Sequence, residues 1–109
     1  MVVPVLYVQN VCTYGKHAPM DFEWDERKRA QIIEDRALDL ASAYLFFDGR
    51  PAIHQPTPRN QEERWKTTAE IEGAFFTVVW TWRGETIRVI SMRRAHEQES
   101  RKYRETHGG

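Results

Sequence analysis

Several residue patterns that define common functional sites are absent from this sequence of 109 residues. Its one cysteine, Cys12, can form neither an internal disulfide nor a CxxC metal or redox motif. The four histidines are scattered without the spacing of metal ligands, and no glycine-rich phosphate-binding loop is present. We therefore expect neither a metal site nor a cofactor.

Long apolar runs and an excess of charge are also missing. No stretch approaches membrane-spanning length, so no membrane partner is expected. Residues 2–8 are apolar, but no basic segment precedes them and no clear cleavage site follows, which favours a cytoplasmic protein over a secreted one. Lys and Arg together number 16 and so do Asp and Glu, which argues against strong long-range attraction of nucleic acid.

The balanced total conceals a basic C-terminal stretch. Between Arg83 and Arg104 seven Lys or Arg residues stand against three Glu residues, a local net charge of +4. Such a patch on a neutral protein suits a short anionic ligand. The apolar fraction of 40% and the charged fraction of 29% are typical of a globular protein, and the length suits one domain.

The beginning of the chain differs from the rest. It contains Pro4, Gly15 and Pro19 and shows no clear periodicity. We treat residues 1–19 as an N-terminal extension of unknown role and residues 20–105 as the domain. The extension is either an added strand or a stretch upstream of a true start at Met20.

Two helices are predicted after this extension. Asp25 is a good N-cap for a helix over residues 26–36, and Asp39 is a candidate cap for a second helix that ends at Asp48-Gly49. Spacing of 3.6 residues per turn predicts which side chains face the core. These are Ala30, Ile33 and Ala37 in the first helix and Leu40, Ala43, Tyr44 and Phe47 in the second.

Strands dominate the second half of the sequence. A short strand near residues 52–54 lies in a proline-containing loop, and residues 63–71 alternate in polarity. Residues 74–82 are rich in β-branched and aromatic side chains, and a turn at Arg83-Gly84 leads into a strand over 86–92. With a last helix over 96–105, the fold class is α+β: an antiparallel three- to four-stranded sheet with its helices on one face.

The hairpin pattern places one arginine in an unusual position. With Arg83-Gly84 as the loop, Trp80, Val78 and Phe76 share an apolar face with Ile87, Val89 and Ser91. Arg88 then lies mid-strand on the other, half-polar face. It is either a solvated charge or a phosphate ligand, and a different turn length would exchange the faces.

Arginine, lysine and tyrosine are the reactive side chains that remain. RNA can be cleaved without a metal when the ribose 2′-OH attacks the neighbouring phosphate. Arginine stabilises the charge of the transition state through its forked donors, and Tyr, Lys, Glu or His can move the protons. Composition permits this chemistry without identifying it.

The order of motifs along the chain resembles the BrnT family over about three quarters of the sequence. The FEWD start and the RVISMRRA stretch, similar to the family's R-I-I-S-A-R-x-A, are together specific. The matching positions are Phe22-Glu23-Trp24-Asp25, Lys28, Ala43, Phe46-Phe47-Asp48, Arg59, Glu63-Arg64-Trp65, Gly73, Val78-Val79, Thr81, Arg83, Ile87 to Ser91, Arg93, Ala95, Glu99 and Tyr103.

The resemblance implies the toxin of a type II toxin–antitoxin system. It implies a fold like that of RelE-type toxins, ribosome-independent RNA cleavage and growth arrest. The implied partner is a BrnA-like antitoxin with a ribbon-helix-helix DNA-binding domain. Two toxins and two antitoxins are expected to form a complex that represses its own promoter, so that DNA is contacted through the antitoxin.

The resemblance and the chemistry together give a set of candidate site residues. The candidate catalytic residues are Arg59, Glu63, Arg64, Arg88, Arg93 and Tyr103. The candidate RNA-binding residues are Lys28, Arg36 and Arg101. Two roles stay open, since Glu63 is a base or the partner of Arg64, and Tyr103 is an acid or packs on the sheet. Arg88 and Arg93 are the preferred phosphate ligands, and we expect either to be removable without loss of stability.

The sequence departs from the family at the end of the first helix. The family has Lys-His-Gly where this chain has Asp35-Arg36-Ala37, which removes two possible proton carriers or phosphate contacts. The family also favours Thr or Ser at position 96, where this chain has His96, so only half of a capping box with Glu99 remains. These changes leave a second hypothesis open: a degenerate toxin that only binds its antitoxin. A plain RNA-binding domain is a third.

Overall fold

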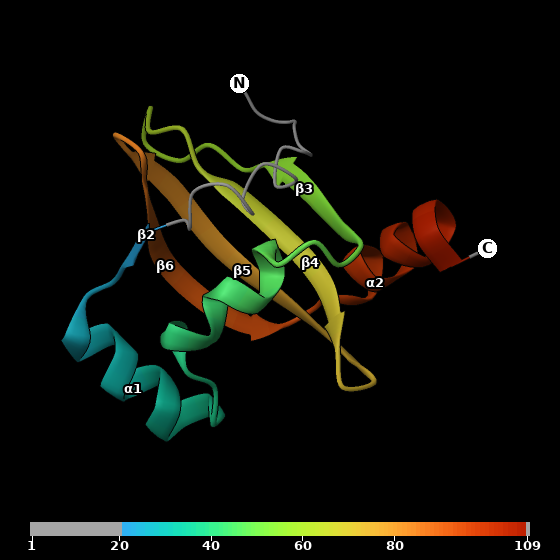
Figure 1. The fold of residues 1–109 in the computed structure, drawn as a ribbon, viewed down its shortest axis with the longest axis horizontal. Coiled ribbons are helices and arrows are strands. Elements are labelled where there is room, and N and C mark those ends of the chain that lie inside the picture. The colour runs from blue at the N-terminus through green and yellow to red at the C-terminus, as the bar shows by residue number, and fades with distance from the viewer. Residues whose placement is uncertain (1–20, 109) are drawn as a thin grey trace.

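A computed structural model describes residues 21–108 of the chain. Nine elements follow one another in this part of the protein (Figure 1). They are β2 (Asp21–Glu23), α1 (Glu26–Arg36), the 3-10 helix η2 (Leu40–Phe47), β3 (Ala52–Pro56), β4 (Trp65–Ile71), β5 (Ala74–Arg83), β6 (Thr86–Arg94), α2 (Glu97–Tyr103) and a π-helical turn η3 (Arg104–Gly108). The proposed extension over residues 1–19 lies outside the described residues.

Within residues 21–108 the sheet has five strands in the order β2-β6-β5-β4-β3. The α+β class is confirmed, whereas an antiparallel sheet of three to four strands is wrong in detail. Strands β3 to β6 form the expected antiparallel meander, but β2 pairs with β6 in parallel. A strand of three residues is too short to show alternation in sequence, so β2 could not be recognised there.

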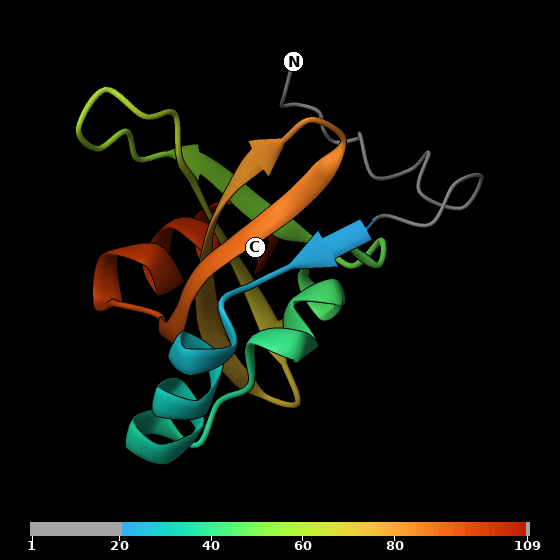
Figure 2. The ribbon, with the colours of Figure 1, turned by 90° about the vertical axis from the view of Figure 1, so that its left-hand side faces the viewer.

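Helices cover both faces of the sheet, contrary to the prediction that they share one (Figure 2). One face, called here the core face, carries Val78, Trp80, Ile87, Val89 and Met92 and packs on α1 and η2. The opposite face packs on α2 and is called the α2 face. Two buried side chains of α2, Glu99 and Tyr103, lie four residues apart, so both point at the sheet.

Helix α1 begins as predicted, with Asp25 accepting hydrogen bonds from the backbone N–H groups of Arg27 and Lys28. The predicted core stripe is wrong, however, because Ala30, Ile33 and Ala37 are all exposed. Ile32 is buried at 3% exposure, whereas Ile33 is 42% exposed. Two adjacent isoleucines do not define a helical phase, which is decided by the packing of α1 on β6 and η2.

The second helix follows a period of three rather than 3.6. It is a 3-10 helix capped by Asp39, as expected, and it buries Leu40, Ala43 and Phe46. Side chains three residues apart eclipse one another in this geometry, so Tyr44 falls outside the stripe and is 56% exposed. The prediction that Tyr44 belongs to the core is therefore wrong.

Among the residues that the structure describes, no helix combines the length and the apolar character that crossing a membrane requires.

Candidate active site

The β5–β6 hairpin determines where the candidate arginines point. Its two turn residues are Gly84 and Glu85, one position later than predicted, since Arg83 pairs with Thr86. The pairing therefore shifts by two residues, which leaves the alternation of side chains unchanged. Arg88 lies opposite Thr81, on the face away from the core, as predicted.

A β-bulge follows in the same hairpin. The register shifts by one residue at Ile90, so the faces of β6 exchange beyond this point. Ser91, predicted to lie on the apolar face, lies on the α2 face, and Arg93 pairs with Thr77 there. Arg88 and Arg93 are five positions apart and would point to opposite faces of a regular strand. The bulge places both on the α2 face.

Strand β4 adds a third cation to this face. Lys66 lies opposite Val79, which in turn lies opposite Ser91. This cross-strand row lies between the pair of Arg88 and Thr81 on one side and the pair of Arg93 and Thr77 on the other. The two arginine rows are four β5 positions apart, or about 13 Å at the usual rise of a strand, and Lys66 lies midway.

Glu99 of α2 is inserted between these cations and is only 3% exposed. Both terminal nitrogens of Arg93 donate to its carboxylate, at 2.8 and 2.9 Å. Lys66 Nζ, Thr77 Oγ1 and the backbone N–H of His96 also donate, at 2.9, 2.9 and 2.8 Å. Burial alone would raise the pKa of Glu99, but these donors, Arg93 foremost, outweigh it and hold the pKa well below its usual value.

The other half of the α2 face is less enclosed. Arg88 forms an ion pair of 3.3 Å with Glu23, its neighbour on β2. Arg36 reaches from α1 to β6, where its guanidinium donates to the carbonyl oxygen of Met92 at 2.8 Å and to Ser91 Oγ at 3.3 Å. Arg36 therefore lies beside the row that carries Lys66.

Arg59, Glu63 and Arg64 lie in the β3–β4 connection. Arg59 is exposed and shares a backbone bridge with Glu62. Arg64 Nε donates to Glu62 Oε1 at 2.8 Å, so the carboxylate partner of Arg64 is Glu62, which contradicts the alternative that Glu63 holds Arg64. Glu63 is exposed, and its carbonyl oxygen accepts a hydrogen bond from Thr81, which lies in the Arg88 row.

The remaining candidates lie further apart. Tyr103 is buried between α2 and the sheet with its ring 5.1 Å from that of Phe75, and burial raises its pKa. Lys28 is exposed on α1. Arg101 is exposed on α2 and forms an ion pair of 3.5 Å with Glu97. None of the contacts described for these three side chains joins them to the Glu99 cluster.

Sequence reasoning missed three members of the cluster, Lys66, Thr77 and Glu99. A lysine in the polar phase of an alternating strand is ordinary, so Lys66 carried no signal by itself. Glu99 was noticed only as half of a helix cap, and that half is confirmed by the bond from His96. Its second role depends on strands that lie far from it in sequence.

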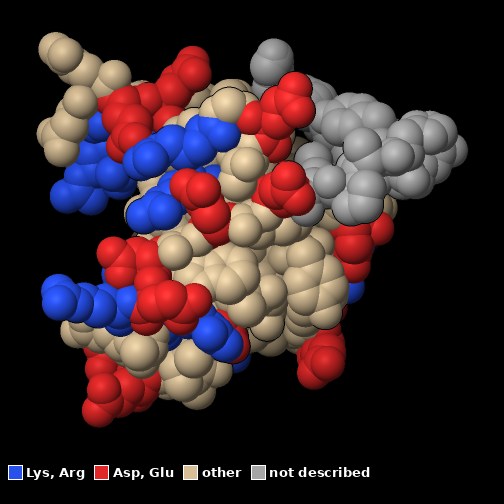
Figure 3. Space-filling view, turned by 60° about the vertical axis from the view of Figure 1, so that its left-hand side comes forward, with Lys and Arg blue, Asp and Glu red and all other residues tan. Residues whose placement is uncertain are grey.

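Charges of both signs meet on the side of the molecule formed by α1, β2 and β6 (Figure 3). Lys and Arg alternate there with Asp and Glu and do not form a continuous basic surface. Among the candidate cations, ion pairs with carboxylates are formed by Arg64, Arg88, Arg93 and Arg101. Within residues 21–108, no group of three or more His, Cys, Asp or Glu side chains is arranged to hold a metal ion.

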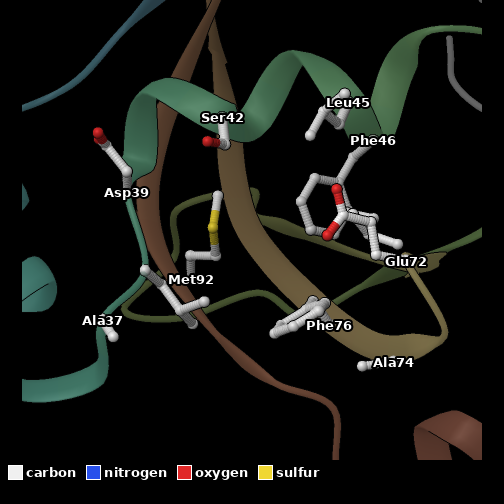
Figure 4. Close-up of a pocket in the computed structure, with 11 residues that line it drawn as sticks. Ala37, Asp39, Ser42, Leu45, Phe46, Glu72, Ala74, Phe76 and Met92 are labelled. Carbon is white, nitrogen blue, oxygen red and sulfur yellow. The ribbon is translucent and has the colours of Figure 1, made fainter.

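A separate pocket of about 350 Å³ opens on the core face between η2 and the sheet (Figure 4). Met92 and Phe76 point into it from the strands, and Phe46 closes one side. Its charged lining residues are Asp39 and Glu72, both acidic. This lining disfavours a phosphate, so the α2 face is the better candidate for RNA.

Residues 24–99 match the family described as ribonuclease toxin, BrnT, of type II toxin-antitoxin system. The chain belongs to this family. Membership implies an RNA substrate and an antitoxin partner. No curated protein matches the sequence. The matched range begins at Trp24 and ends at Glu99, so it spans both halves of the α2 face.

Membership gives the departures at the end of α1 a structural meaning. Ala37 is the C-cap of α1 and adopts a left-handed conformation, with φ 59° and ψ 32°. Glycine is the usual residue in this conformation, so an alanine at this position places a side chain on a left-handed backbone. The change at position 36 affects the site more, because Arg36 contacts Ser91 and Met92 of β6.

Proposed function

We propose that this toxin is a metal-independent endoribonuclease that binds RNA on the α2 face and arrests growth. Arg88 and Arg93 hold the scissile phosphate and stabilise the charge that develops as the 2′-OH attacks. Lys66 supplies a third positive charge between them. Glu63 and Tyr103 are the candidates for the proton transfers, with Arg59 and Arg64 as further catalytic candidates.

One observation carries this proposal. The bulge at Ile90 brings Arg88 and Arg93 to one face together with Lys66. Each side chain is between a quarter and a third exposed, at 30%, 25% and 27% in that order, so each is partly desolvated yet reachable. Charge-assisted hydrogen bonds to a phosphate are strong in such surroundings. Lys28, Arg36 and Arg101 are proposed as contacts to flanking nucleotides.

The proposed partner is a BrnA-like antitoxin with a ribbon-helix-helix domain. Two toxins and two antitoxins form the complex, which represses its own promoter through the antitoxin. Both proteins act in the cytoplasm, where RNA is available. These details rest on the resemblance of the sequence to the family.

A second candidate function is a degenerate toxin that binds its antitoxin without cleaving RNA. The observation that favours it is the pairing of the cations with carboxylates: Arg64 with Glu62, Arg88 with Glu23, and Arg93 with Glu99. A guanidinium that already holds a carboxylate must exchange or share it to bind a phosphate. RNA cleavage by the purified protein decides between the two functions.

The decisive assay follows a labelled RNA in the presence of EDTA. Wild-type protein should degrade it, and Arg88→Ala should reduce the rate by a factor of about 10² to 10³, the usual effect of losing one donor to a transition-state oxyanion. Arg27→Ala is the matched control, since Arg27 is exposed on α1 and no role is assigned to its side chain. Arg88→Lys should restore little, because lysine lacks the forked geometry.

Induced expression in cells, with and without the cognate antitoxin, complements this assay. Growth arrest by the wild type, relieved by the antitoxin and absent for Arg88→Ala, is the expected pattern. Full activity of both Arg88→Ala and Arg93→Ala would move the site to Arg59 and Arg64. An inactive wild-type protein that still binds the antitoxin would establish the degenerate toxin instead.

A further inference from the structure

We infer that Glu99 is a positioning residue of the RNA site, which fixes Arg93 and Lys66 in one geometry before RNA binds. The inference rests on the proposed function and adds a residue to which the cleavage chemistry assigns no step. Glu99 acts through the two cations and takes no part in bond making. Its carboxylate is the point at which α2, β4, β5 and β6 meet.

The carboxylate is itself held rigidly by neutral donors. Thr77 Oγ1 and the backbone N–H of His96 both donate to Oε1, one from the sheet and one from the start of α2. Thr77 is in turn hydrogen-bonded to Thr68 at 2.9 Å, and both threonines are fully buried. The negative charge therefore has a fixed position that does not depend on the cations.

The two cations are attached to this fixed point in different ways. Arg93 uses both terminal nitrogens, so the plane of its guanidinium is set and its Nε–H is left free of Glu99. Lys66 uses one of three ammonium donors on Oε2, which leaves two. Because both cations bind one carboxylate, their remaining donors lie close together.

The balance of charge around Glu99 supports a role beyond attaching α2 to the sheet. One carboxylate between two cations cancels their mutual repulsion and leaves a net charge of +1 for a phosphate. Catalytic groups that are fixed in advance avoid reorganisation during the reaction, and a displacement of about 1 Å can cost a factor of about 10² in rate. A carboxylate that only attached α2 to the sheet would affect folding and leave the rate of the folded protein unchanged.

The central experiment is the kinetics of Glu99→Gln on RNA at a temperature where circular dichroism shows the variant to be folded. We expect kcat to fall by a factor of about 10 to 100, because Arg93 and Lys66 lose their common anchor. KM should stay the same or decrease, because removal of a negative charge favours RNA binding. Thr67→Val is the matched control: it removes buried hydrogen bonds with Trp80 and His54 on the core face, away from the cluster, and should leave kcat within a factor of about two.

Glu99→Asp serves if Glu99→Gln does not fold. It keeps the charge but is one methylene shorter, so it cannot reach all its donors, and kcat should again fall while KM is kept. Unchanged kcat in a folded Glu99 variant would overturn the inference. So would an equal loss of kcat in Thr67→Val, since the effect would then follow stability alone.

A spectroscopic measurement separates this inference from the proposed function. In ¹⁵N-labelled wild type, the bidentate pair should slow rotation of the Arg93 guanidinium and give resolved Nη resonances, which Glu99→Gln should average. An inactive wild type with these restrained resonances would refute the ribonuclease proposal and with it the catalytic meaning of the anchor. An active wild type whose Arg93 rotates freely would refute the positioning inference alone.

Discussion

Arg88 and Arg93 should differ sharply in what their loss does to stability. From the sequence we predicted that either arginine could be replaced by alanine with the melting temperature kept near that of the wild type. In the structure Arg93 makes two of the five hydrogen bonds that Glu99 accepts, and Glu99 is buried. Among the residues that the structure describes, Arg88 forms its ion pair with Glu23, whose side chain is 40% exposed. We therefore expect Arg93→Ala to destabilise the protein and Arg88→Ala to leave it nearly unchanged.

The magnitude follows from the carboxylate that Arg93→Ala leaves behind. Removing one partner of a buried ion pair costs about 3–5 kcal/mol when the other charge is left uncompensated. Here Lys66, Thr77 and the N–H of His96 remain, so we expect about 2–4 kcal/mol. Loss of the Arg88 pair should cost at most about 1 kcal/mol. For a domain of this size the melting temperatures should fall by roughly 10–25 °C and by less than about 8 °C respectively.

Urea denaturation at pH 7 measures both free energies, with an unchanged m-value as the check for two-state behaviour. The pKa of Glu99 is lowered in the folded protein, so its stabilisation is complete above the unfolded pKa of about 4.3 and is lost as the pH falls below that. The gap between wild type and Arg93→Ala should thus narrow below about pH 4. Equal stability of the two alanine variants at pH 7 would refute the reasoning.

Three further results are expected. Ala37→Gly should stabilise the protein by about 1 kcal/mol because of the left-handed backbone there, whereas Ala30→Gly in the middle of α1 should destabilise it by a similar amount. In urea denaturation, Ile32→Ala should lower the free energy of unfolding by about 2–4 kcal/mol and Ile33→Ala by under about 1 kcal/mol, since Ile32 is buried and Ile33 is exposed. The reverse order would contradict the observed phase of α1. Burial lowers the pKa of His54 to about 4 in the folded protein. As the pH falls from 6.5 to 4, the unfolded chain therefore binds a proton at His54 before the folded protein does, and the free energy of unfolding should fall by up to about 3 kcal/mol. The melting temperature of His54→Phe should depend less on pH over this range than that of the wild type. An equal pH dependence in the two proteins would assign the effect to another group.

The strands and helix caps were predictable because their signals are local. β-branched and aromatic residues identify β5 and β6, and an aspartate before a helical stretch marks the start of α1. The phase of α1 and the 3-10 character of η2 were not predictable, because packing decides both. Strand β2 escaped detection because its pairing with β6 bridges more than sixty positions of sequence.

Residues of the candidate site were predictable only where they belong to a recognisable sequence motif. Arg88 and its face followed from the hairpin pattern, which tolerated a turn misplaced by one residue because the pairing shifted by an even number. The face of Arg93 could not be foreseen, because a bulge leaves no distinct residue signature around Ile90. The Glu99 cluster depends on three strands and a helix that converge only after folding.

The bulge makes the length of β6 as important as its composition. Most substitutions at Ile90 would preserve the count of residues between Arg88 and Arg93, and with it the direction of both side chains. Deletion of this one residue would remove the bulge and leave Arg88 and Arg93 four positions apart, so regular alternation would keep both side chains on the α2 face. A change of one residue in the length of this segment therefore keeps both arginines on the α2 face only if the bulge is lost with it.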